Sequence, residues 1–575
     1  MLLKYVGNIF YYPNRLLHKY IFKMDKAYFR RIEETEQFHF TFRYTNKDLK
    51  VDRQFNFTRQ ISEPVSVFLG RLNTNIEKIV IRKNKKKSSE NIPTELNIKL
   101  RINGEDVLEN KLCDEVFIEG NRINLSLPGQ MFDVVINSPW IETLALPSSI
   151  LATYPVYPSK FEAFHTNFSQ SKFIWYTSKE KKDWMEVSKN HIFEPQNNLV
   201  ESYLKLICTP INNDVEGPSV EVESNDKIQA GPGVCPFEMR HQFTRYRSWK
   251  NVFRIVTYNI LADLYCDSDF SRDSLYAYCP PYALQLDYRK QLILKELMGY
   301  NADIICLQEV DRKVFKHDLQ PFLSFIGLQG EYAIKGGEVA EGVACFFRSN
   351  KFSLLKTDRI VFCEHIDKDP LFSYIWSKVV ENPKLVTRIL ELKTTLQTVL
   401  LQSTDNENEL LFVANTHLYF HPDADHIRLL QAGFAITFIQ NSLETIKKEY
   451  PEKRISLVFC GDFNSIPDCG IYKLFTTGSV PEDFIDYKSN AEEAVKNLKL
   501  EQNIPLASAC GTPQFTNFTS GFADCLDYIF YQTNNLKVTQ VVPLPSNEEL
   551  TQNTALPSIV FPSDHIALIS DIQWL

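Results

Sequence analysis

The sequence predicts a two-domain protein in which a mostly-β N-terminal part precedes an α/β C-terminal part. At 575 residues the chain exceeds one ordinary hydrophobic core, since domains hold roughly 150 residues each. In the first third of the chain, apolar and polar residues alternate as they do in half-buried strands. From Phe253 onward, short apolar runs alternate with helical stretches, which is the pattern of an α/β domain.

The composition is that of a globular protein. Hydrophobic residues make up 44% and aromatic residues 13% of the chain, which is ample for packed cores. Because the formal net charge is −8, a nucleic acid would have to meet a local basic cleft assisted by bound cations. This balance fits a metal-dependent enzyme and argues against a nucleic-acid coat protein. No apolar stretch reaches the length of a membrane span, so we expect no membrane association.

The twelve cysteines are scattered and form no Cys-x-x-Cys pair. Several of them, such as Cys306, Cys345 and Cys460, lie inside apolar strand-like runs. This pattern predicts reduced thiols in the core and a reducing compartment, and it argues against a structural zinc knuckle.

Residues 1–24 carry four basic residues and no acid among many apolar side chains. They resemble a mitochondrial transit segment more than a secretory signal, because they lack a long apolar core and a small-residue cleavage site. We therefore expect a protein of the mitochondrial matrix. The alternatives are an ordinary basic N-terminus and a shorter cytoplasmic form that starts at Met24.

The N-terminal domain is predicted over residues 36–207 as a β-sandwich-like fold. Alternation of period two marks its strands, at residues 38–44, 96–102 and 123–127. Asn103-Gly104 after the second of these runs predicts a hairpin turn. Proline, glycine and asparagine then concentrate in residues 208–249, which predicts a linker.

The C-terminal domain is predicted over residues 250–575. Helical stretches are expected over residues 288–298 and 425–443, and Gly299 suits the C-terminal end of the first one. The apolar run of residues 302–307 predicts a buried strand that delivers Gln308 and Glu309 at its end.

The most informative peptide is Cys-Gly-Asp-Phe-Asn-Ser at residues 460–465. It follows a short apolar run, so Asp462 and Asn464 emerge at the C-terminal end of a strand, where α/β sheets usually carry their sites. The two residues are two positions apart, which puts both side chains on one face of an extended segment. Both can therefore reach one metal ion or one phosphate.

Five other segments also place polar residues where apolar runs end. They are Thr257–Asn259, Leu307–Glu309, Asn415–His417, Leu526–Phe530 and Ser563–His565. Each alone has an ordinary explanation, such as a turn cap or a loop residue. Six such segments in one domain supply the acidic, amide and imidazole groups needed to hold Mg²⁺ and activate water against a phosphodiester.

In this order the six segments resemble the endonuclease/exonuclease/phosphatase superfamily. The longer stretches Tyr258–Asp263, Asn415–Tyr419 and Ser563–Ile566 are similar to its deadenylase branch. Within that branch, Gly231–Gly233, Tyr278–Leu284 and the N-terminal β domain are most similar to the mitochondrial 2′,5′-phosphodiesterase type. The resemblance spans nearly the whole chain. It implies a deoxyribonuclease I-like fold for residues 250–575, with two packed sheets flanked by helices.

The resemblance implies that Glu309 is the main ligand of Mg²⁺, with Asp462 and Asn464 completing the site. The site could hold one or two Mg²⁺ ions, and Mn²⁺ is expected to be able to substitute. Two ions would act as a clamp on the attacking and leaving oxygens. Asp462 is also the candidate base that takes a proton from the attacking water.

The same resemblance implies which side chains contact the phosphate of the substrate. Asn259 and Asn464 would donate hydrogen bonds to its oxygens, and His417 would lie on the scissile phosphate. Asp527 would hold His565 and raise the pKa of its imidazole, which favours a protonated form that faces the phosphate.

The terminal adenine would be bound, by the same resemblance, among Phe522, Asn464 and Pro422, because aromatic rings stack on bases. Phe518 is a further candidate, although relatives often have tyrosine at its position. The alternative for both phenylalanines is ordinary core packing.

Two other clusters have alternative interpretations. His417, His421, Asp423 and His426 have a spacing that resembles a zinc site, although separate roles fit better. Lys83, Lys85, Lys86 and Lys87 predict a solvated hairpin loop or, failing that, a contact with an RNA backbone.

We therefore expect a Mg²⁺-dependent exoribonuclease that hydrolyses 2′,5′-oligoadenylate and 3′,5′ poly(A) tails from the free hydroxyl end and releases 5′-AMP. RNA is the expected partner, and no stable protein partner is implied. The N-terminal β domain is expected to grip RNA or to shield the mouth of the site. The alternatives are a cytosolic-type deadenylase, a dinucleotide 2′-phosphatase of the same superfamily, and a catalytically silent RNA-binding protein.

Overall fold

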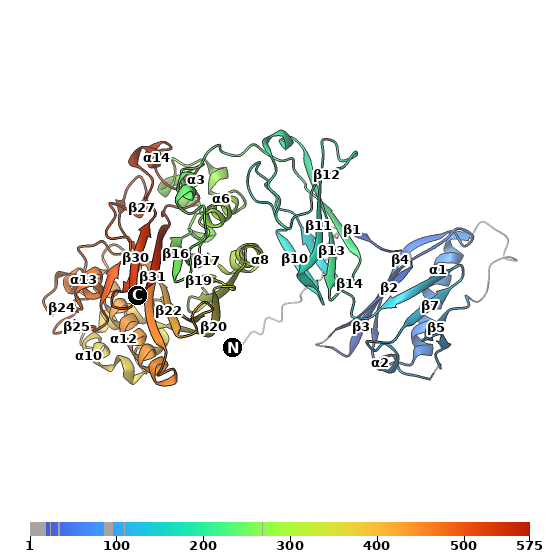
Figure 1. Ribbon diagram of the computed structural model, residues 1–575, viewed down its shortest axis with the longest axis horizontal. Coiled ribbons are helices and arrows are strands. Elements are labelled where there is room, and N and C mark those ends of the chain that lie inside the picture. The colour runs from blue at the N-terminus through green and yellow to red at the C-terminus, as the bar shows by residue number, and fades with distance from the viewer. Residues whose placement is uncertain (1–18, 24, 33–34, 85–95, 109, 267) are drawn as a thin grey trace, which may run out of the picture. The chain divides into compact units, whose positions relative to one another are not determined.

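The computed structural model describes residues 19–23, 25–32, 35–84, 96–108, 110–266 and 268–575 (Figure 1). The chain divides into two compact units. Residues 1–148, 157–193 and 201–228 form the N-terminal unit, and residues 149–156, 194–200 and 229–575 form the C-terminal unit. Most of the predicted transit segment, residues 1–18 and 24, lies outside the described residues.

The N-terminal unit contains a seven-stranded sheet of order β4-β3-β2-β8-β7-β5-β6. Its strands are β2 (Lys26–Ile32), β3 (Gln37–Asn46), β4 (Val51–Gln60), β5 (Lys99–Ile102), β6 (Glu105–Asp106), β7 (Ile123–Leu127) and β8 (Gln130–Val135). The buried side chains Phe38, Phe40 and Phe42 of β3 form its core together with residues of helix α1 (Val65–Asn84). The short helix α2 (Cys113–Val116) adds to the same core.

Helix α1 is a correction to the predicted β-sandwich. Phe68, Leu72 and Ile76 are fully buried and recur every four residues, which is the spacing of one helix face. The prediction counted only period-two runs and missed this spacing. Lys83 lies in the last turn of α1, so the basic run follows a helix and does not join two strands. Lys85, Lys86 and Lys87 lie outside the described residues.

The N-terminal unit also contains a six-stranded sheet, in which β14 (Val215–Glu216) pairs with β13. The path of the other five strands is β1 (Lys19–Ile21), β15 (Ser219–Glu223), β13 (Tyr203–Asn212), β11 (Asn167–Ser178) and β12 (Met185–Ser188). A separate hairpin joins β9 (Trp140–Ala145) and β10 (Lys160–Phe164).

The predicted linker of residues 208–249 is a second correction. Its first part consists of strands β13, β14 and β15, and the unit boundary falls between Ile228 and Gln229. Asn213 and Asp214 have φ angles of 47° and 68° and form the turn between β13 and β14, so they mark a hairpin. A Cβ on Gly217 would lie 1.8 Å from the Pro139 carbonyl oxygen, so this glycine permits a close backbone approach within the unit.

The C-terminal unit is built from two sheets, as the resemblance implied, and each sheet has six strands. The first sheet contains β18 (Leu328–Ile334), β19 (Glu341–Arg348), β17 (Ile304–Asp311), β16 (Val252–Asn259), β31 (Leu568–Trp574) and β30 (Leu536–Val541). The second contains β20 (Phe352–Val361), β21 (Thr395–Ser403), β22 (Glu409–His417), β23 (Arg454–Asp462), β29 (Asp527–Gln532) and β26 (Leu506–Ser508). One buried cluster joins Ile255 and Ile304 of the first sheet to Val413 and Val458 of the second, so the sheets pack face to face.

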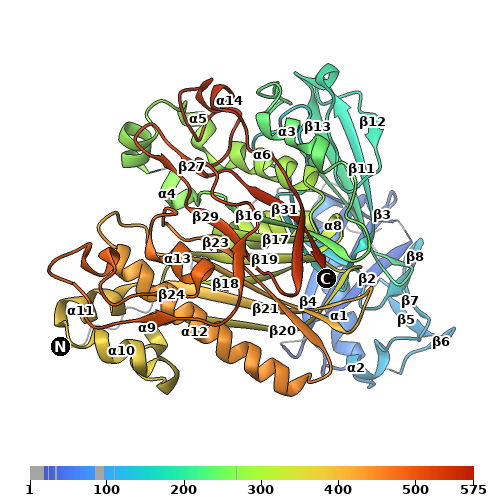
Figure 2. The same cartoon turned by 60° about the vertical axis from the view of Figure 1, so that its left-hand side comes forward.

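Helices cover the outside of this sandwich. The two predicted helices are present as α6 (Leu286–Gly299) and α12 (Asp425–Glu449). Helix α12 lies along the second sheet (Figure 2). Its residues Leu430 and Phe434 share a buried cluster with Leu400 and Leu457 of that sheet. The other helices are α3 (Pro236–Arg240), α4 (Asp263–Cys266), α5 (Pro281–Leu284), α7 (Arg312–Val314), α8 (Gln320–Phe325), α9 (Phe362–His365), α10 (Ser373–Val379), α11 (Pro383–Glu391), α13 (Gly470–Thr477) and α14 (Asn547–Thr551). The remaining short strands are β24 (Ser479–Val480), β25 (Leu500–Glu501), β27 (Asn517–Phe518) and β28 (Ala523–Asp524).

All twelve cysteines are free thiols, and ten of them are buried, which agrees with the prediction of core thiols. Within the described part of the chain, no helix is long and apolar enough to cross a membrane.

Candidate active site

The ends of strands from both sheets converge on one buried site. Strand β22 runs parallel to β23, and its last residue, His417, pairs with Asp462. On the other side of β23, Asp462 pairs with Asp527 at the start of β29. In the first sheet, β16 and β17 are also parallel and end at Asn259 and close to Glu309. The six predicted segments therefore meet at the edge that the sequence predicted.

One amide group joins the two sheets across this site. Nδ2 of Asn259 donates hydrogen bonds to Oε1 of Glu309 at 3.0 Å and to Oδ2 of Asp462 at 2.9 Å. The other oxygen of Glu309 accepts a hydrogen bond from the backbone N–H of Ala262 at 2.9 Å. Asn259 therefore holds two carboxylates close together, so its amide hydrogens are occupied and not directed at a phosphate in this geometry.

The backbone at Glu309 and Asn464 adopts an unusual conformation. Their φ angles are 55° and 48°, in the left-handed region that costs non-glycine residues free energy. At Glu309 this coincides with a register shift between β17 and β19, which is a bulge that redirects a side chain. At Asn464 it lets the backbone N–H donate to Oδ1 of Asp462 at 2.9 Å. The amide of Asn464 donates to the Leu418 carbonyl at 3.0 Å, which leaves its Oδ1 for a ligand.

His565 and Asp527 form a buried hydrogen-bonded pair, as the resemblance implied. Nδ1 of His565 lies 2.8 Å from Oδ2 of Asp527, and its Nε2 lies 3.5 Å from Oδ2 of Asp462. Burial alone would lower the pKa of His565. The negative charges of Asp527 and Asp462 outweigh burial and raise that pKa well above the usual range. His565 is therefore a cation at neutral pH.

His417 contacts the same carboxylate as His565, but its imidazole is neutral. Its Nε2 is 3.5 Å from Oδ2 of Asp462, and within the described structure its Nδ1 has no hydrogen-bond partner. Burial, together with the positive charges of Lys335 and His565, lowers the pKa of His417 well below the usual range. One neutral and one charged imidazole thus flank Asp462.

The positive charges near the carboxylates of the site are too few to balance their negative charge. Burial, followed by the negative charges of Asp564 and Glu341, raises the pKa of Glu309 to about 7. Burial is also the largest cause that raises the pKa of Asp462 to about 6. Oδ1 of Asp564 is buried without a hydrogen-bond partner among the described residues. A divalent cation would relieve this excess of negative charge, and hard carboxylate oxygens suit Mg²⁺.

Two sets of residues could contribute ligands. Asp462, Asp527 and His565 offer atoms that lie within 4.8 Å of one another. This set is the poorer one, because His565 is charged and bonded to Asp527. Glu309 and Asp462, with Oδ1 of Asn464, present oxygen atoms only, so the predicted ligand set fits the cation better.

The predicted base-binding residues differ in exposure. The ring of Phe522 is 47% exposed and lies in a turn closed by the Thr519 N–H, which donates to the Phe522 carbonyl at 2.7 Å. Pro422 is exposed as well. Phe518 is half-buried and packs edge-on against Phe515, with ring centroids 5.1 Å apart. Phe522 and Pro422 can therefore meet a ligand, whereas Phe518 also serves core packing.

The zinc-like spacing does not form a metal site in the structure. His417 faces Asp462, and His421 pairs with Asp423. His426 is fully buried, and its two nitrogens contact Ser489 at 2.8 Å and Glu493 at 2.9 Å. These side chains have separate partners, as the preferred interpretation expected.

Several positioning residues escaped the sequence analysis. Arg289 of α6 is fully buried and donates hydrogen bonds to the carbonyls of Leu261 at 2.9 Å and Pro562 at 3.1 Å. It thereby fixes the loops that carry Ala262 and His565. A charged residue inside a predicted helix was the only signal, and the sequence does not show which carbonyls lie near it.

Ser563 and Asp564 also act as positioning residues. The hydroxyl of Ser563 donates to the Asn259 carbonyl at 2.7 Å, which ties the segment before His565 to the end of β16. Oδ2 of Asp564 accepts hydrogen bonds from the Tyr276 hydroxyl at 2.9 Å and from the Asn517 amide at 3.3 Å. The Ser563–His565 segment is therefore fixed on both sides of the site.

Comparison with known proteins identifies the class. Residues 256–565 match the model of the Endonuclease/Exonuclease/phosphatase family, and residues 138–229 match the model of the 2′,5′-phosphodiesterase 12-like N-terminal domain. The chain belongs to the Endonuclease/Exonuclease/phosphatase family and is a hydrolase. The second match begins just before β9 and ends at the boundary between the two units.

Individual relatives show which members of the family the chain is similar to. The chain is 40% identical over 558 residues to 2′,5′-phosphodiesterase 12 of Homo sapiens, a match that covers 90% of each chain. It is 31% identical over 440 residues to carbon catabolite repressor protein 4 homolog 1 of Arabidopsis thaliana, covering 68% of this chain and 70% of that one. A solved structure of ANGEL2, a 2′,3′-cyclic phosphatase, has a TM-score of 0.46 and 24% identity, and covers 57% of this chain and 99% of that one. The predicted superfamily, its deadenylase branch and the similarity to a 2′,5′-phosphodiesterase are confirmed.

Proposed function

We propose that this hydrolase is a Mg²⁺-dependent exoribonuclease that shortens adenosine-rich RNA from its free hydroxyl end and releases 5′-AMP. Its substrates would be 2′,5′-oligoadenylate and 3′,5′ poly(A) tails. The 40% identity to a protein named 2′,5′-phosphodiesterase 12 supports the first substrate. Similarity to 3′-5′-exoribonuclease subunits of the CCR4-Not complex, such as 30% identity over 351 residues in Schizosaccharomyces pombe, supports the second.

The observation that carries the proposal is the shared hydrogen bonding of Asn259 to Glu309 and Asp462 beside the charged His565. Glu309, Asp462 and Asn464 would hold Mg²⁺, which when bound polarises a phosphate oxygen and neutralises its charge. Mn²⁺ would be able to substitute.

Asp462 would accept the proton of the attacking water. Its Oδ2 lies 3.5 Å from Nε2 of both His417 and His565, the groups that would face the phosphate, so a water attacking the phosphorus would be within reach of this carboxylate. Asp527 keeps His565 protonated, so the Nε2–H of His565 can stabilise the negative charge that grows on the phosphate oxygens. His417 is neutral and would orient the phosphate by a hydrogen bond.

The ring of Phe522 would stack on the terminal adenine, and Pro422 would border the same base. Phe522 is half exposed, and Asn517 in the preceding strand pairs with His565 of the site. Stacking on this ring tolerates either linkage because it does not involve the sugar. This arrangement supports one site for both 2′,5′- and 3′,5′-linked chains.

We also propose a mitochondrial location, on the basic, acid-free composition of residues 1–24. Fluorescence microscopy of the chain fused at its C-terminus to a fluorescent protein tests this. Mitochondrial signal that is lost when residues 1–23 are removed supports it, and cytoplasmic signal from the intact chain contradicts it.

Product analysis tests the function. Purified protein is incubated with 2′,5′- and 3′,5′-linked oligoadenylates and with NADPH, each with Mg²⁺ or with EDTA, and the products are identified by mass spectrometry. We expect 5′-AMP from both oligoadenylates only in the presence of Mg²⁺. Release of phosphate from NADPH without 5′-AMP would instead identify a dinucleotide 2′-phosphatase.

A further inference from the structure

The segment that leads into β16 combines basic and aromatic side chains in an unusual way. The ten residues 241–250 contain three Lys or Arg residues, three Phe, Tyr or Trp residues and no acid, in a chain whose net charge is −8. Tyr246 is 76% exposed and Trp249 is 85% exposed. Both rings are therefore open to a ligand. Basic residues interleaved with aromatic ones are typical of surfaces for single-stranded nucleic acid.

The backbone of this segment is held by buried charges. Nη1 of Arg254 donates to the carbonyls of Thr244 at 3.2 Å and Tyr246 at 3.0 Å. Ser248 bonds to the buried carboxylate of Asp303, and Nζ of Lys351 contacts the same carboxylate at 3.2 Å. The exposed rings therefore stand on a fixed backbone, which reduces the entropy lost when a ligand binds.

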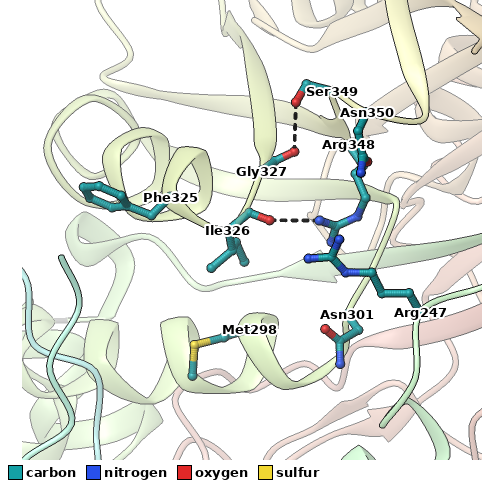
Figure 3. A pocket seen from close by; sticks show the side chains of 9 residues that line it. All are labelled: Arg247, Met298, Asn301, Phe325, Ile326, Gly327, Arg348, Ser349 and Asn350. Carbon is teal, nitrogen blue, oxygen red and sulfur yellow. Dashed lines mark hydrogen bonds between the residues drawn. The ribbon is translucent and has the colours of Figure 1, made fainter. Parts of the chain in front are cut away.

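A cavity of about 520 Å³ lies next to the segment. Arg247 and Arg348 contribute cationic groups to its lining, and Asn301, Ser349 and Asn350 contribute polar ones. Figure 3 shows the guanidinium groups of Arg247 and Arg348 next to each other. Arg348 is buried, donates a hydrogen bond to the Ile326 carbonyl at 2.8 Å and forms an ion pair with Asp303 at 3.3 Å. Arg247 is exposed and has no ion-pair partner among the described residues.

Arg348 already has Asp303 as an anionic partner, whereas the guanidinium of Arg247 beside it has no ion-pair partner among the described residues and is available to bind an anion. The proximity of the two guanidinium groups is also evident from the pKa of Arg348, which burial and then the charge of Arg247 lower. A phosphate matches the fork geometry of arginine, and the apolar atoms of Met298 and Ile326 in the same cavity suit a base or a sugar. The cavity volume is in the range of sites for small ligands.

This surface lies away from the candidate active site. Lys250 precedes β16, whose last residue is Asn259, and Arg348 ends β19 beside the first residues of β17. The segment and the cavity are thus at the opposite ends of the strands that carry Asn259 and Glu309. A strand of eight residues spans about 25 Å, so a nucleotide chain would need several residues to reach both places.

We propose that Arg245–Lys250 and the adjacent cavity form a second binding surface for single-stranded RNA, which holds the body of a long substrate while its end is in the active site. Arg247, with Arg348 beside it, would bind a phosphate, and Tyr246 and Trp249 would stack on bases. The identity of the ligand rests on the proposed function, because RNA is there the substrate. Short oligoadenylates would not reach this surface, so it would distinguish substrates by length.

Steady-state kinetics of the full chain on oligoadenylates of 3 and 20 residues tests this inference. The variant Arg247→Gln/Trp249→Ala should raise KM for the longer substrate by about ten-fold or more and leave kcat unchanged, since one phosphate contact and one stacked base are lost. Its KM for the trimer should not change. Lys448→Gln removes an exposed charge elsewhere on the unit and serves as the matched control, and Trp249→Phe should retain most of the affinity.

Direct binding separates this inference from the proposed function. Fluorescence anisotropy of a labelled 20-residue oligoadenylate in EDTA needs no hydrolysis, and the double variant should weaken that binding by a similar factor. The slope of log affinity against log salt should fall by about 0.7, as for one lost phosphate contact to a single strand. Unchanged binding of the long oligonucleotide, as expected if a protein partner occupies this surface, would overturn the inference. Equal losses for the trimer and the long substrate would also overturn it.

Discussion

The two ends of the first sheet of the C-terminal unit handle buried charge in opposite ways. At the end where β16 begins, Arg254 forms two hydrogen bonds with Asp571, at 2.7 and 2.9 Å, and Asp303 is bonded to Lys351 and Arg348. At the other end, Glu309 and Asp462 share one neutral amide, and Asp564 has an unpartnered oxygen.

This difference in charge pairing distinguishes residues that stabilise the fold from residues that serve the reaction. Removing one partner of a buried ion pair destabilises the fold, because the other charge stays buried without compensation. Buried carboxylates without a matching cation have raised pKa values and cost stability, so they persist where a ligand supplies the missing charge. The comparison leads to predictions in which the unpaired end controls activity and the paired end controls stability.

The largest expected effect is on activity. Glu309→Gln should reduce kcat/KM on oligoadenylate by at least about 10³-fold, since it removes the main carboxylate ligand while preserving the hydrogen bond from Asn259. Its free energy of unfolding should change by less than about 2 kcal/mol, because removal of a buried charge opposes the loss of the hydrogen bond from the Ala262 N–H. Glu407→Gln, at an exposed loop, is the matched control and should behave as the wild type. Hydrolysis at the wild-type rate by Glu309→Gln would show that this carboxylate is not part of the catalytic site.

At the paired end, Arg254→Ala should destabilise the C-terminal unit by about 3–5 kcal/mol, because Asp571 remains buried without its partner. The loss should appear as a lower midpoint in urea unfolding followed by tryptophan fluorescence. The protein that remains folded should hydrolyse the trimer at close to the wild-type rate. A variant that unfolds normally but has lost trimer hydrolysis would reverse the assignment of the two ends.

Glu296 provides a further test of this comparison. It is a buried acid near the end where β16 begins, but one of its carboxylate oxygens, Oε2, lacks a hydrogen-bond partner among the described residues. Burial raises its pKa to about 7. The folded state therefore holds the proton more tightly than the unfolded state does. The stabilisation is complete below the unfolded pKa near 4.5 and disappears as pH rises through about 7.

The measurement is the free energy of unfolding of wild type and Glu296→Gln between pH 4.5 and 8. Relative to the variant, the wild type should lose on the order of 3 kcal/mol across this window. A difference between the two proteins that stays constant with pH would contradict the raised pKa of Glu296.

The smallest expected effect concerns base recognition. Phe522→Ala should weaken the transition-state binding of oligoadenylate by about 1–3 kcal/mol, the value of one stacked base, without changing metal affinity. Phe522→Tyr should retain the stacking. The check is kcat/KM on adenylate, uridylate and cytidylate oligomers. An equal loss for all three would contradict a role in selecting adenine.

The sequence was sufficient to predict which segments come together at the candidate site, because their polar residues follow apolar runs directly in the chain. Asp462, Asn464 and His417 stand at strand ends, and parallel pairing of β22 with β23 brings them together. The architecture of two packed sheets followed from the resemblance. In contrast, helix α1 was missed, since its apolar spacing was not compared with the helical period.

Other features depend on contacts that sequence order does not encode. The role of Asn259 between two carboxylates requires the two sheets to face each other, and the role of Arg289 depends on carbonyls from residues far along the chain. The linker prediction failed because turns within a sheet and flexible linkers have the same composition. The predicted mitochondrial location depends on a segment mostly outside the described residues and stays a prediction.

The central claim is that Glu309 and Asp462, from two different sheets, together bind a divalent cation. Electron paramagnetic resonance of Mn²⁺ titrated into the full chain measures this directly and independently of hydrolysis. The account predicts saturable binding that Mg²⁺ displaces, that is lost in both Glu309→Gln and Asp462→Asn, and that persists in Glu407→Gln. Binding of equal affinity in the wild type and in the two site variants would contradict it.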